Sequence, residues 1–282
     1  MNTIAKPMGK PSILVAGYGA AGKPFADGFG AAGAQVLAVD SRAENPSEQI
    51  VLRGDLPGDL TEFDLIVSIV PASNVPDLMQ EISRRPGTAP VLDLSSSDAK
   101  TMQAVADLLP SRLVDGVILG AVGMTGHRTP VVLAGEASTT VEALLAPLGC
   151  QITVLENGAI GDAGKLKLLR SILTKGLEAL VVELHISASV MGLEPLLPLA
   201  LKDLETLNFN DFMREMLRTH PRHAGRRHIE VTQARDSLAA LNLPSPMSDA
   251  AIHVFARTKA AGVGPDGDLR TALDWLLPTI EA

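Results

Sequence analysis

The first half of the chain alternates short, almost wholly apolar runs with longer stretches of mixed polarity. Runs of this length, without alternation of polar and apolar positions, are typical of strands buried on both faces of a parallel sheet. Because stretches of helical or loop character separate the runs, the pattern predicts a doubly wound α/β sheet. The runs cover residues 13–16, 35–39, 65–70, 91–94, 113–115 and 131–134.

The pattern changes at about residue 160, beyond which Leu-, Ala- and Glu-rich stretches recur to the end of the chain. A long stretch without proline predicts a helix over about 163–190, and we expect an all-helical second domain. The apolar residues of this helix recur at intervals of three and four, which indicates a face turned toward a protein core. They are Leu169, Ile172, Leu173, Leu177, Leu180, Val181 and Leu184.

A glycine-rich segment directly follows the first apolar run. Gly17, Gly19 and Gly22 have the spacing G-x-G-x-x-G, in which the glycines permit a tight turn, close approach of a pyrophosphate, and close packing of the next helix. The N-terminus of that helix would face the phosphate charge. The motif predicts a Rossmann dinucleotide-binding domain over residues 11–160, followed by the helical domain over 161–282. The expected contacts of this turn with the cofactor are Gly17, Tyr18, Gly19, Ala20, Ala21 and Gly22.

The second apolar run ends in Asp40, where such domains carry the acidic residue that hydrogen-bonds the adenosine ribose. Arg42 could reach a 2′-phosphate, whereas Asp40 would repel one. Because the carboxylate comes at the strand end, NAD is favoured over NADP. We expect Asp40, Ser41 and Arg42 to contact the cofactor. The alternative is a nucleotide-free domain in which the glycines only turn a strand into a helix.

Two further loops follow predicted strands, and ligands of open α/β sheets lie outside the carboxyl ends of strands. Val70, Pro71 and Asn74 follow the third run, and Ser95 and Ser96 follow the fourth. We expect the first group to bind the cofactor. Proline, serine and asparagine are also favoured in ordinary turns, so turn chemistry alone remains an alternative for both loops.

Composition narrows the class of partner. A net charge of −8 and an aromatic content of 3% argue against a nucleic-acid surface. Cys150 is the only cysteine, which excludes an intrachain disulfide and favours a reducing compartment. No run is long and uncharged enough to span a bilayer, and residues 1–11 lack the apolar core of a signal peptide. We expect a cytoplasmic protein that binds a small molecule, without membrane, nucleic acid or metal.

A polar face accompanies the apolar one on the predicted helix over 163–190. Lys167, Ser171, Thr174 and Glu178 are spaced by four, three and four residues and therefore share a side of the helix. A solvated helix face would have the same pattern.

Residues 158–167, Gly158-Ala159-Ile160-Gly161-Asp162-Ala163-Gly164-Lys165-Leu166-Lys167, resemble the start of the interdomain helix in the β-hydroxyacid dehydrogenase superfamily. This superfamily includes 3-hydroxyisobutyrate and 6-phosphogluconate dehydrogenases. In its pattern G-x-x-G-x-G/A-x-x-x-K-x-x-x-N, the catalytic lysine falls on Lys167 and the asparagine position is occupied by Ser171. The resemblance extends to the glycine motif, the Val70-Pro71 loop, residues 93–96 and residues 115–121.

The resemblance implies an NAD(P)-dependent dehydrogenase that acts on a 3-hydroxy acid or related alcohol, with Lys167 as general acid and base. Because free lysine titrates near ~10.4, burial or a nearby positive charge must lower the pKa of Lys167. The family comparison places Ser95, Ser96, Gly120 and Ser171 at the substrate. Leu119 stands where the family has a serine that holds the substrate carboxylate, and Ala121 replaces the second glycine of that motif.

The C-terminal half is similar to a phosphogluconate dehydrogenase-like subgroup through residues 170–180 and 221–227. Within it, His223 and Arg227 would share a helix face suited to an anionic substrate, with Arg226 nearby. A solvated surface with ion pairs to Glu230 and Asp236 is the alternative. Relatives bury the apolar surface of their helical domains in a dimer, so the resemblance also implies a homodimer.

Two other functions fit the same sequence. Imine reduction occurs on this architecture, although Lys167 argues against it. A non-catalytic nucleotide-binding sensor would fit the missing asparagine and the missing substrate serine.

Overall fold

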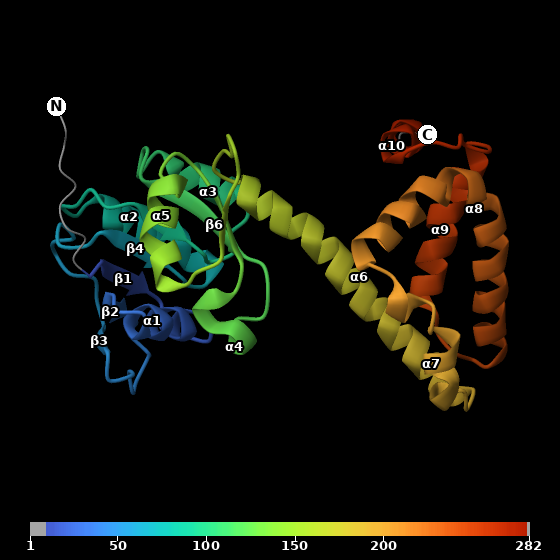
Figure 1. The fold of residues 1–282 in the computed structure, drawn as a ribbon, viewed down its shortest axis with the longest axis horizontal. Helices are drawn as coiled ribbons and strands as arrows, with labels where there is room; N and C mark the ends of the chain where they lie inside the picture. Colours follow the sequence, from blue (N-terminus) through green and yellow to red (C-terminus); the bar gives the residue numbers. More distant parts are fainter. Residues whose placement is uncertain (1–9, 281–282) are drawn as a thin grey trace. The chain divides into compact units, whose positions relative to one another are not determined.

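The computed structural model describes residues 10–280 (Figure 1). The described chain divides into two compact units, one ending at Ile172 and the other beginning at Leu173. All strands of the described residues lie in the first unit, and the second consists of helices and their connections.

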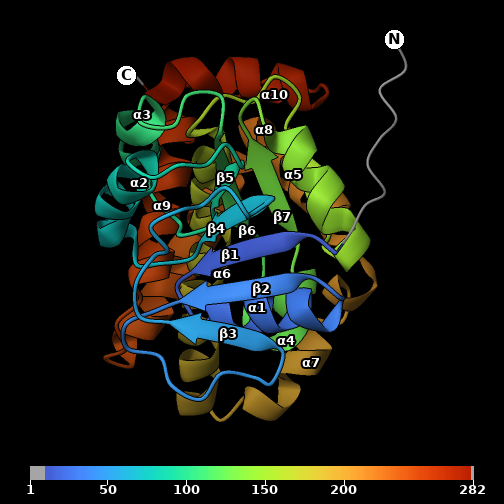
Figure 2. The same cartoon turned by 90° about the vertical axis from the view of Figure 1, so that its left-hand side faces the viewer.

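The described part of the first unit contains an eight-stranded sheet with the order β3-β2-β1-β4-β5-β6-β7-β8 (Figure 2). Neighbouring strands are parallel except for the pair β6 and β7, which is antiparallel; β7 and β8 are again parallel to each other. The order reverses between β1 and β4, which makes this the switch point where ligands of doubly wound sheets bind. The strands are β1 Ser12–Ala16, β2 Gln35–Val39, β3 Ile50–Arg53, β4 Leu65–Ser68, β5 Val91–Asp93, β6 Leu113–Ile118, β7 Val131–Ala134 and β8 Ile152–Val154.

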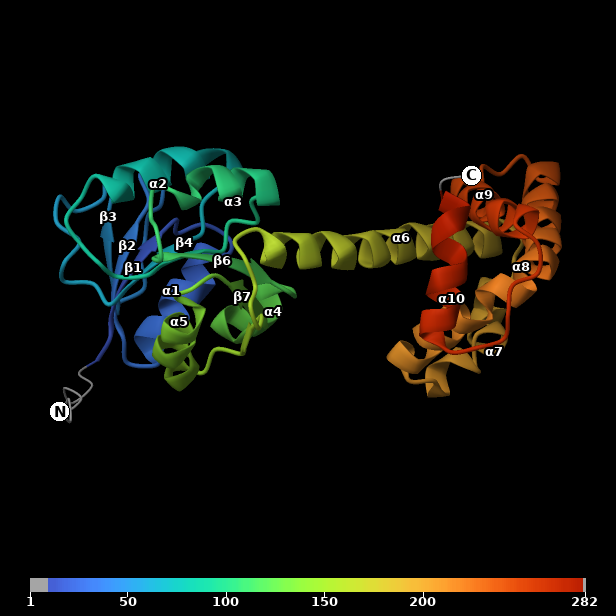
Figure 3. The ribbon, with the colours of Figure 1, turned by 90° about the horizontal axis from the view of Figure 1, so that it is seen from above.

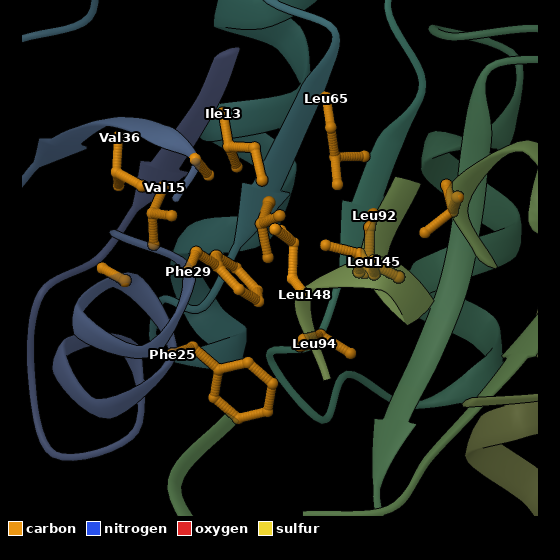
Figure 4. Close-up of a cluster of buried hydrophobic side chains, with 14 of the residues drawn as sticks. Ile13, Val15, Phe25, Phe29, Val36, Leu65, Leu92, Leu94, Leu145 and Leu148 are labelled. Carbon is orange, nitrogen blue, oxygen red and sulfur yellow. The ribbon is translucent and has the colours of Figure 1, made fainter. Parts of the chain in front are cut away.

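Helices cover both faces of the sheet, with α2 and α3 on one side and α1, α4 and α5 on the other (Figure 3). Phe25 and Phe29 of α1 form a core with the strands on their side, joined by Leu145 of α5 (Figure 4). Met79 of α2 and Met102 of α3 are buried in the core of the opposite face. The helices are α1 Gly22–Ala31, α2 Val75–Ser83, α3 Ala99–Ala106, α4 Val122–Thr125 and α5 Ser138–Leu145.

The second unit contains the larger part of α6, a helix that begins in the first unit, followed by four further helices in the described residues. Both carboxylate oxygens of Glu183 in α6 accept hydrogen bonds at the N-terminus of α9, from the backbone N–H groups of Met247 at 2.7 Å and Ser248 at 3.0 Å. This contact satisfies donors that a helix start leaves without partners. The helices are α6 Asp162–Val190, α7 Leu197–Ala200, α8 Phe209–Ala240, α9 Pro246–Ala260 and α10 Leu269–Leu276.

Within the described residues, most of the apolar face predicted on α6 is exposed and only Leu184 is half-buried, so the expectation of a core-facing stripe is wrong. Leu169 and Ile172 are 64% and 67% exposed, and Leu173, Leu177, Leu180 and Val181 are also exposed. The periodicity of apolar residues identifies a face that is suited to burial, but it does not tell whether the covering surface belongs to the same chain.

Candidate active site

The glycine-rich turn between β1 and α1 has the conformation that its motif predicts. Gly17 lies at φ +99°, and a Cβ atom there would overlap the carbonyl oxygen of Ile69. A Cβ atom at Gly22 would overlap the carbonyl oxygen of Gly17. At Gly19 a Cβ atom would meet nothing within 4 Å. Packing therefore dictates the first and third glycines, whereas the second faces open space, as the approach of a phosphate requires.

Asp40, directly after β2, is tied to this turn. Its Oδ2 accepts the backbone N–H of Tyr18 at 3.0 Å, and its Oδ1 accepts that of Arg42 at 2.9 Å. Burial opposes ionisation of Asp40, but the backbone N–H groups of Tyr18 and Arg42 outweigh it and lower the pKa of the carboxyl group. Asp40 thus places a negative charge beside the turn.

The other residues predicted to contact the cofactor in this region differ in whether their side chains are buried or exposed. The Tyr18 ring is buried in the core, and its hydroxyl donates to Asp27 at 2.6 Å and accepts from Lys23 at 3.0 Å. Only the backbone of Tyr18 is therefore available at the turn. Ala20, Ser41 and Arg42 are exposed and Ala21 is half-buried.

The loops after β4 and β5 are in direct contact. The hydroxyl oxygen of Ser95 accepts the backbone N–H of Val70 at 3.0 Å and lies 3.1 Å from the Ser68 hydroxyl. Pro71 and Asn74 are exposed in and before a short 3-10 helix, Ala72–Asn74. Residues that the sequence placed in separate loops thus share one edge of the sheet.

Lys167 and Ser96 meet at this edge, since the Nζ atom of Lys167 donates a hydrogen bond to the hydroxyl of Ser96. Ser96 has φ +63°, in the left-handed region that residues other than glycine seldom adopt, and such strained positions concentrate at functional sites. Lys167 is half-buried. Burial, together with the positive charge of Arg170, lowers the pKa of Lys167.

Two glycines allow the start of α6 to lie against the Ser96 loop. Gly161 has φ +100°, and a Cβ atom there would lie 3.0 Å from the Cβ of Ala99. A Cβ atom at Gly164 would lie 3.3 Å from the carbonyl oxygen of Ser97. This close approach is what carries Lys167, one turn further along α6, to Ser96.

Sequence reasoning missed two buried carboxyl groups beneath this arrangement. Asp93 accepts a hydrogen bond from the Ser68 hydroxyl at 2.7 Å, and Asp115 accepts the backbone N–H groups of Gly161 at 2.8 Å and Gly164 at 3.4 Å. The sequence shows an acidic residue in each of two apolar runs, but only the strand register shows that the two are neighbours.

Among the described residues, Lys167 forms no hydrogen bond with the predicted substrate residues Gly120 and Ser171. Gly120 is exposed beyond β6, and Ser171 is half-buried on the next turn of α6. Leu119 packs against a small buried cluster that includes Val117 and Ala163. The leucine that replaces the family's serine is therefore a packing residue.

The basic group of the second unit lies on α8. Arg227 donates a hydrogen bond to Thr219 at 2.9 Å, and His223 is half-buried. Arg226 forms an ion pair with Glu230, as the alternative of a solvated surface predicts, whereas Asp236 pairs with Arg235.

Within residues 10–280, no cluster of three His, Cys, Asp or Glu side chains has an arrangement suited to a metal ion. In the same part of the chain, no helix combines the length and the apolar character needed to cross a membrane.

Comparison with known proteins identifies the fold. Residues 188–258 match a family model described as a domain of unknown function, DUF1932. No curated protein sequence matches the chain.

Three solved structures share the architecture. A conserved protein of unknown function, described as similar to 3-hydroxyacid dehydrogenases, is 23% identical with a TM-score of 0.58, over 88% of this chain and 97% of its own. A reductive aminase from Aspergillus terreus, in complex with NADPH, is 17% identical with a TM-score of 0.74, over 95% and 100%. An imine reductase variant from Myxococcus stipitatus, in complex with NAD⁺, is 16% identical with a TM-score of 0.74, over 95% and 99%. The expected fold, a dinucleotide-type sheet followed by a helical part, is thereby confirmed.

Proposed function

We propose that this protein is an NAD(P)-dependent oxidoreductase that transfers a hydride between a nicotinamide cofactor and a 3-hydroxy acid or related alcohol. One continuous series of contacts carries the proposal. Gly17 packs on Ile69, Val70 bonds to Ser95, and Ser96 bonds to Lys167. The glycine turn and the candidate acid–base residue therefore belong to the same edge of one sheet.

The residues of the turn fit a dinucleotide. Gly19 leaves room for a phosphate beside the N-terminus of α1, and Asp40 provides an ionised acceptor for a ribose hydroxyl. The comparison structures with NADPH and NAD⁺ support the class of cofactor. Because Asp40 would repel a 2′-phosphate, we propose NAD as the preferred form, with NADP as the form that binds more weakly.

Lys167 supplies the proton chemistry. When bound, the nicotinamide accepts or donates the hydride. In alcohol oxidation the neutral amine of Lys167 takes the hydroxyl proton, and in the reverse direction its ammonium returns that proton. The lowered pKa of Lys167 favours this exchange, and Ser96 fixes the direction of the amine.

Replacement of Lys167 tests the assignment. We expect Lys167→Ala to lower turnover by ~10²–10⁴-fold, the usual contribution of a positioned acid or base, with little change in NADH affinity. Calorimetry with NADH and NADPH, followed by a panel of 3-hydroxy acids, measures both. Lys165→Ala, two residues earlier and exposed, is the matched control. Unchanged turnover in Lys167→Ala would refute the role.

The same panel separates the other functions. A cyclic imine and an amine–ketone pair are included, and reduction of these without oxidation of any alcohol would favour imine chemistry. Tight NADH binding without turnover of any substrate would favour a sensor.

We also propose a cytoplasmic setting, which fits a single cysteine that burial makes unreactive by raising its pKa to about 12.

A further inference from the structure

One row of residues crosses the sheet near its carboxyl edge, polar in the middle and small at both ends. Register partners along this row are Ala16, Ser68, Asp93, Asp115 and Ala134, from five neighbouring strands. All five are buried, and the two acidic residues are 1% and 2% exposed. Burying two neighbouring carboxyl groups inside a sheet costs free energy of desolvation, so the positions of Asp93 and Asp115 need a physical explanation.

Asp93 organises the loops after β4 and β5. The Ser68 hydroxyl donates to its Oδ1 at 2.7 Å, and the same hydroxyl links Asp93 to Ser95. Ser95 in turn lies 3.1 Å from the Ser68 oxygen and accepts the N–H of Val70. This network determines where the chain leaves β5, and Ser96 is the next residue.

Asp115 organises the start of α6. A single oxygen, Oδ2, accepts the N–H groups of Gly161 and Gly164, donors that the first turn of a helix leaves without partners. A carboxyl group at this end also suits the helix dipole. Lys167 follows Gly164 by three residues on the same helix.

We propose that Asp93 and Asp115 are positioning residues for Lys167. Asp115 fixes the helix that carries the lysine, and Asp93 fixes the loop that carries Ser96, so that together they set the direction of the Lys167–Ser96 hydrogen bond. Neither residue touches the reacting atoms. The inference rests on the proposed function for its catalytic consequence, but the placement of Lys167 is measurable without turnover.

The physical state of Asp93 supports a task beyond stability. Burial, partly opposed by its hydrogen bonds to Ser68 and Ser95, raises the pKa of Asp93 to about 6, and the adjacent Asp115 adds to the rise. Burial likewise raises the pKa of Asp115, with Asp162 adding to the effect. Groups that the fold holds at such a cost are common at functional sites.

Substitutions of graded severity test the proposal. Asp115→Asn keeps an amide oxygen for the same two N–H groups, whereas Asp115→Ala removes it. We expect Asp115→Ala to lower kcat by ~10²-fold, because small misplacements of a catalytic group have effects of this size, and Asp115→Asn to restore most of the loss. Asp93→Asn should lower kcat without lowering the melting temperature. Asp98→Asn, which alters an exposed cap of α3 in the same region, is the control.

The decisive readout is the titration of Lys167 itself, followed by trace acetylation with acetic anhydride across pH and mass spectrometry, with exposed Lys202 as internal reference. We expect the labelling midpoint of Lys167 to lie below that of Lys202 in the native chain and to rise in Asp115→Ala and Asp93→Asn. Unchanged midpoints in both folded variants would overturn the proposal, whatever the turnover. Shifted midpoints in a chain that turns over no substrate would leave the positioning role standing and refute the proposed function.

Discussion

The fold raises the pKa of Asp93 above the value of a free carboxyl group, and this has a consequence for stability. Its pKa is about 6 in the folded chain and 3.8 for a free group, so the folded state binds the proton more tightly. The stabilising contribution is therefore present below about pH 4 and is lost as the pH rises through 6. The loss corresponds to roughly 3 kcal/mol at neutral pH, since one pKa unit equals ~1.36 kcal/mol.

We accordingly expect Asp93→Asn to raise the free energy of unfolding at pH 7, by up to ~3 kcal/mol, and to leave it nearly unchanged at pH 4. Urea denaturation at both pH values measures the difference. Asp98 is the opposite case, because hydrogen bonding to Thr101 lowers the pKa of its carboxyl group. Asp98→Asn should therefore be less stable than the native chain at pH 7, and this difference should shrink as the pH falls. A loss of stability at pH 7 in Asp93→Asn would contradict the argument.

The residues of the candidate site were only partly accessible from the sequence. The glycines were predicted from their spacing, Ser96 from its place after an apolar run, and Lys167 from the resemblance of the helix start to a known superfamily. The contact between Lys167 and Ser96 depends on a separation of 71 residues, which no local pattern encodes. Asp93 and Asp115 were overlooked because each reads as the polar end of an apolar strand, and only the register shows that they are neighbours.

At the scale of elements, the position of the start of α6 depends on a glycine that cannot be replaced by alanine without strain. Gly161 combines φ +100° with a close contact to Ala99. We expect Gly161→Ala to lower the free energy of unfolding by ~1–3 kcal/mol, the range for strained backbone, and to reduce turnover as α6 is displaced. Gly225, inside α8, is the matched control, because a Cβ atom there would lie at an ordinary 3.9 Å from Lys259.

Gly225→Ala should instead stabilise the chain by ~0.5–1 kcal/mol, since alanine loses less backbone freedom in a helix. Chemical denaturation of both variants gives the comparison. Equal effects at the two positions would show that the close approach of α6 to the loop does not matter.

Elements themselves were predicted unevenly. The buried inner strands were apparent as apolar runs, whereas β3 and β8 were not, because Ile50–Arg53 and Ile152–Val154 are partly exposed at the edges of the sheet and include polar residues. The direction of β7 was also inaccessible. A strand buried on both faces has the same apolar composition whichever way it runs.

At the scale of the whole molecule, the exposed apolar face of α6 predicts association. Leu169, Ile172 and Val190 are among many large apolar side chains that the single chain leaves uncovered, and such extended patches mark interfaces. We propose that a second copy covers this face, and expect a dimer by size exclusion with light scattering. A monomer at all concentrations would contradict the proposal.

A charge on this face should disrupt the dimer. We expect the double variant Leu169→Glu, Ile172→Glu to run as a monomer, because burial of an unpaired carboxylate at an interface is strongly unfavourable. Val263→Glu is the control, since Val263 is 82% exposed in the loop after α9 and lies outside this helix. Dissociation of the control to the same extent would indicate a general loss of folding.

The reversed direction of β7 has a consequence for how the protein can change. Crossover connections carry the chain from one edge of the sheet to the other, but residues 119–130 leave β6 and enter β7 at the same edge, the one where Ser96 and Lys167 meet. Val122 packs on the core and the His127 ring lies edge-on to Phe29 of α1, so it is the exposed residues between them, 123–125, that can lengthen without shifting any parallel pair. An insertion there would change the surface at this edge of the sheet while leaving the contact between Lys167 and Ser96 in place.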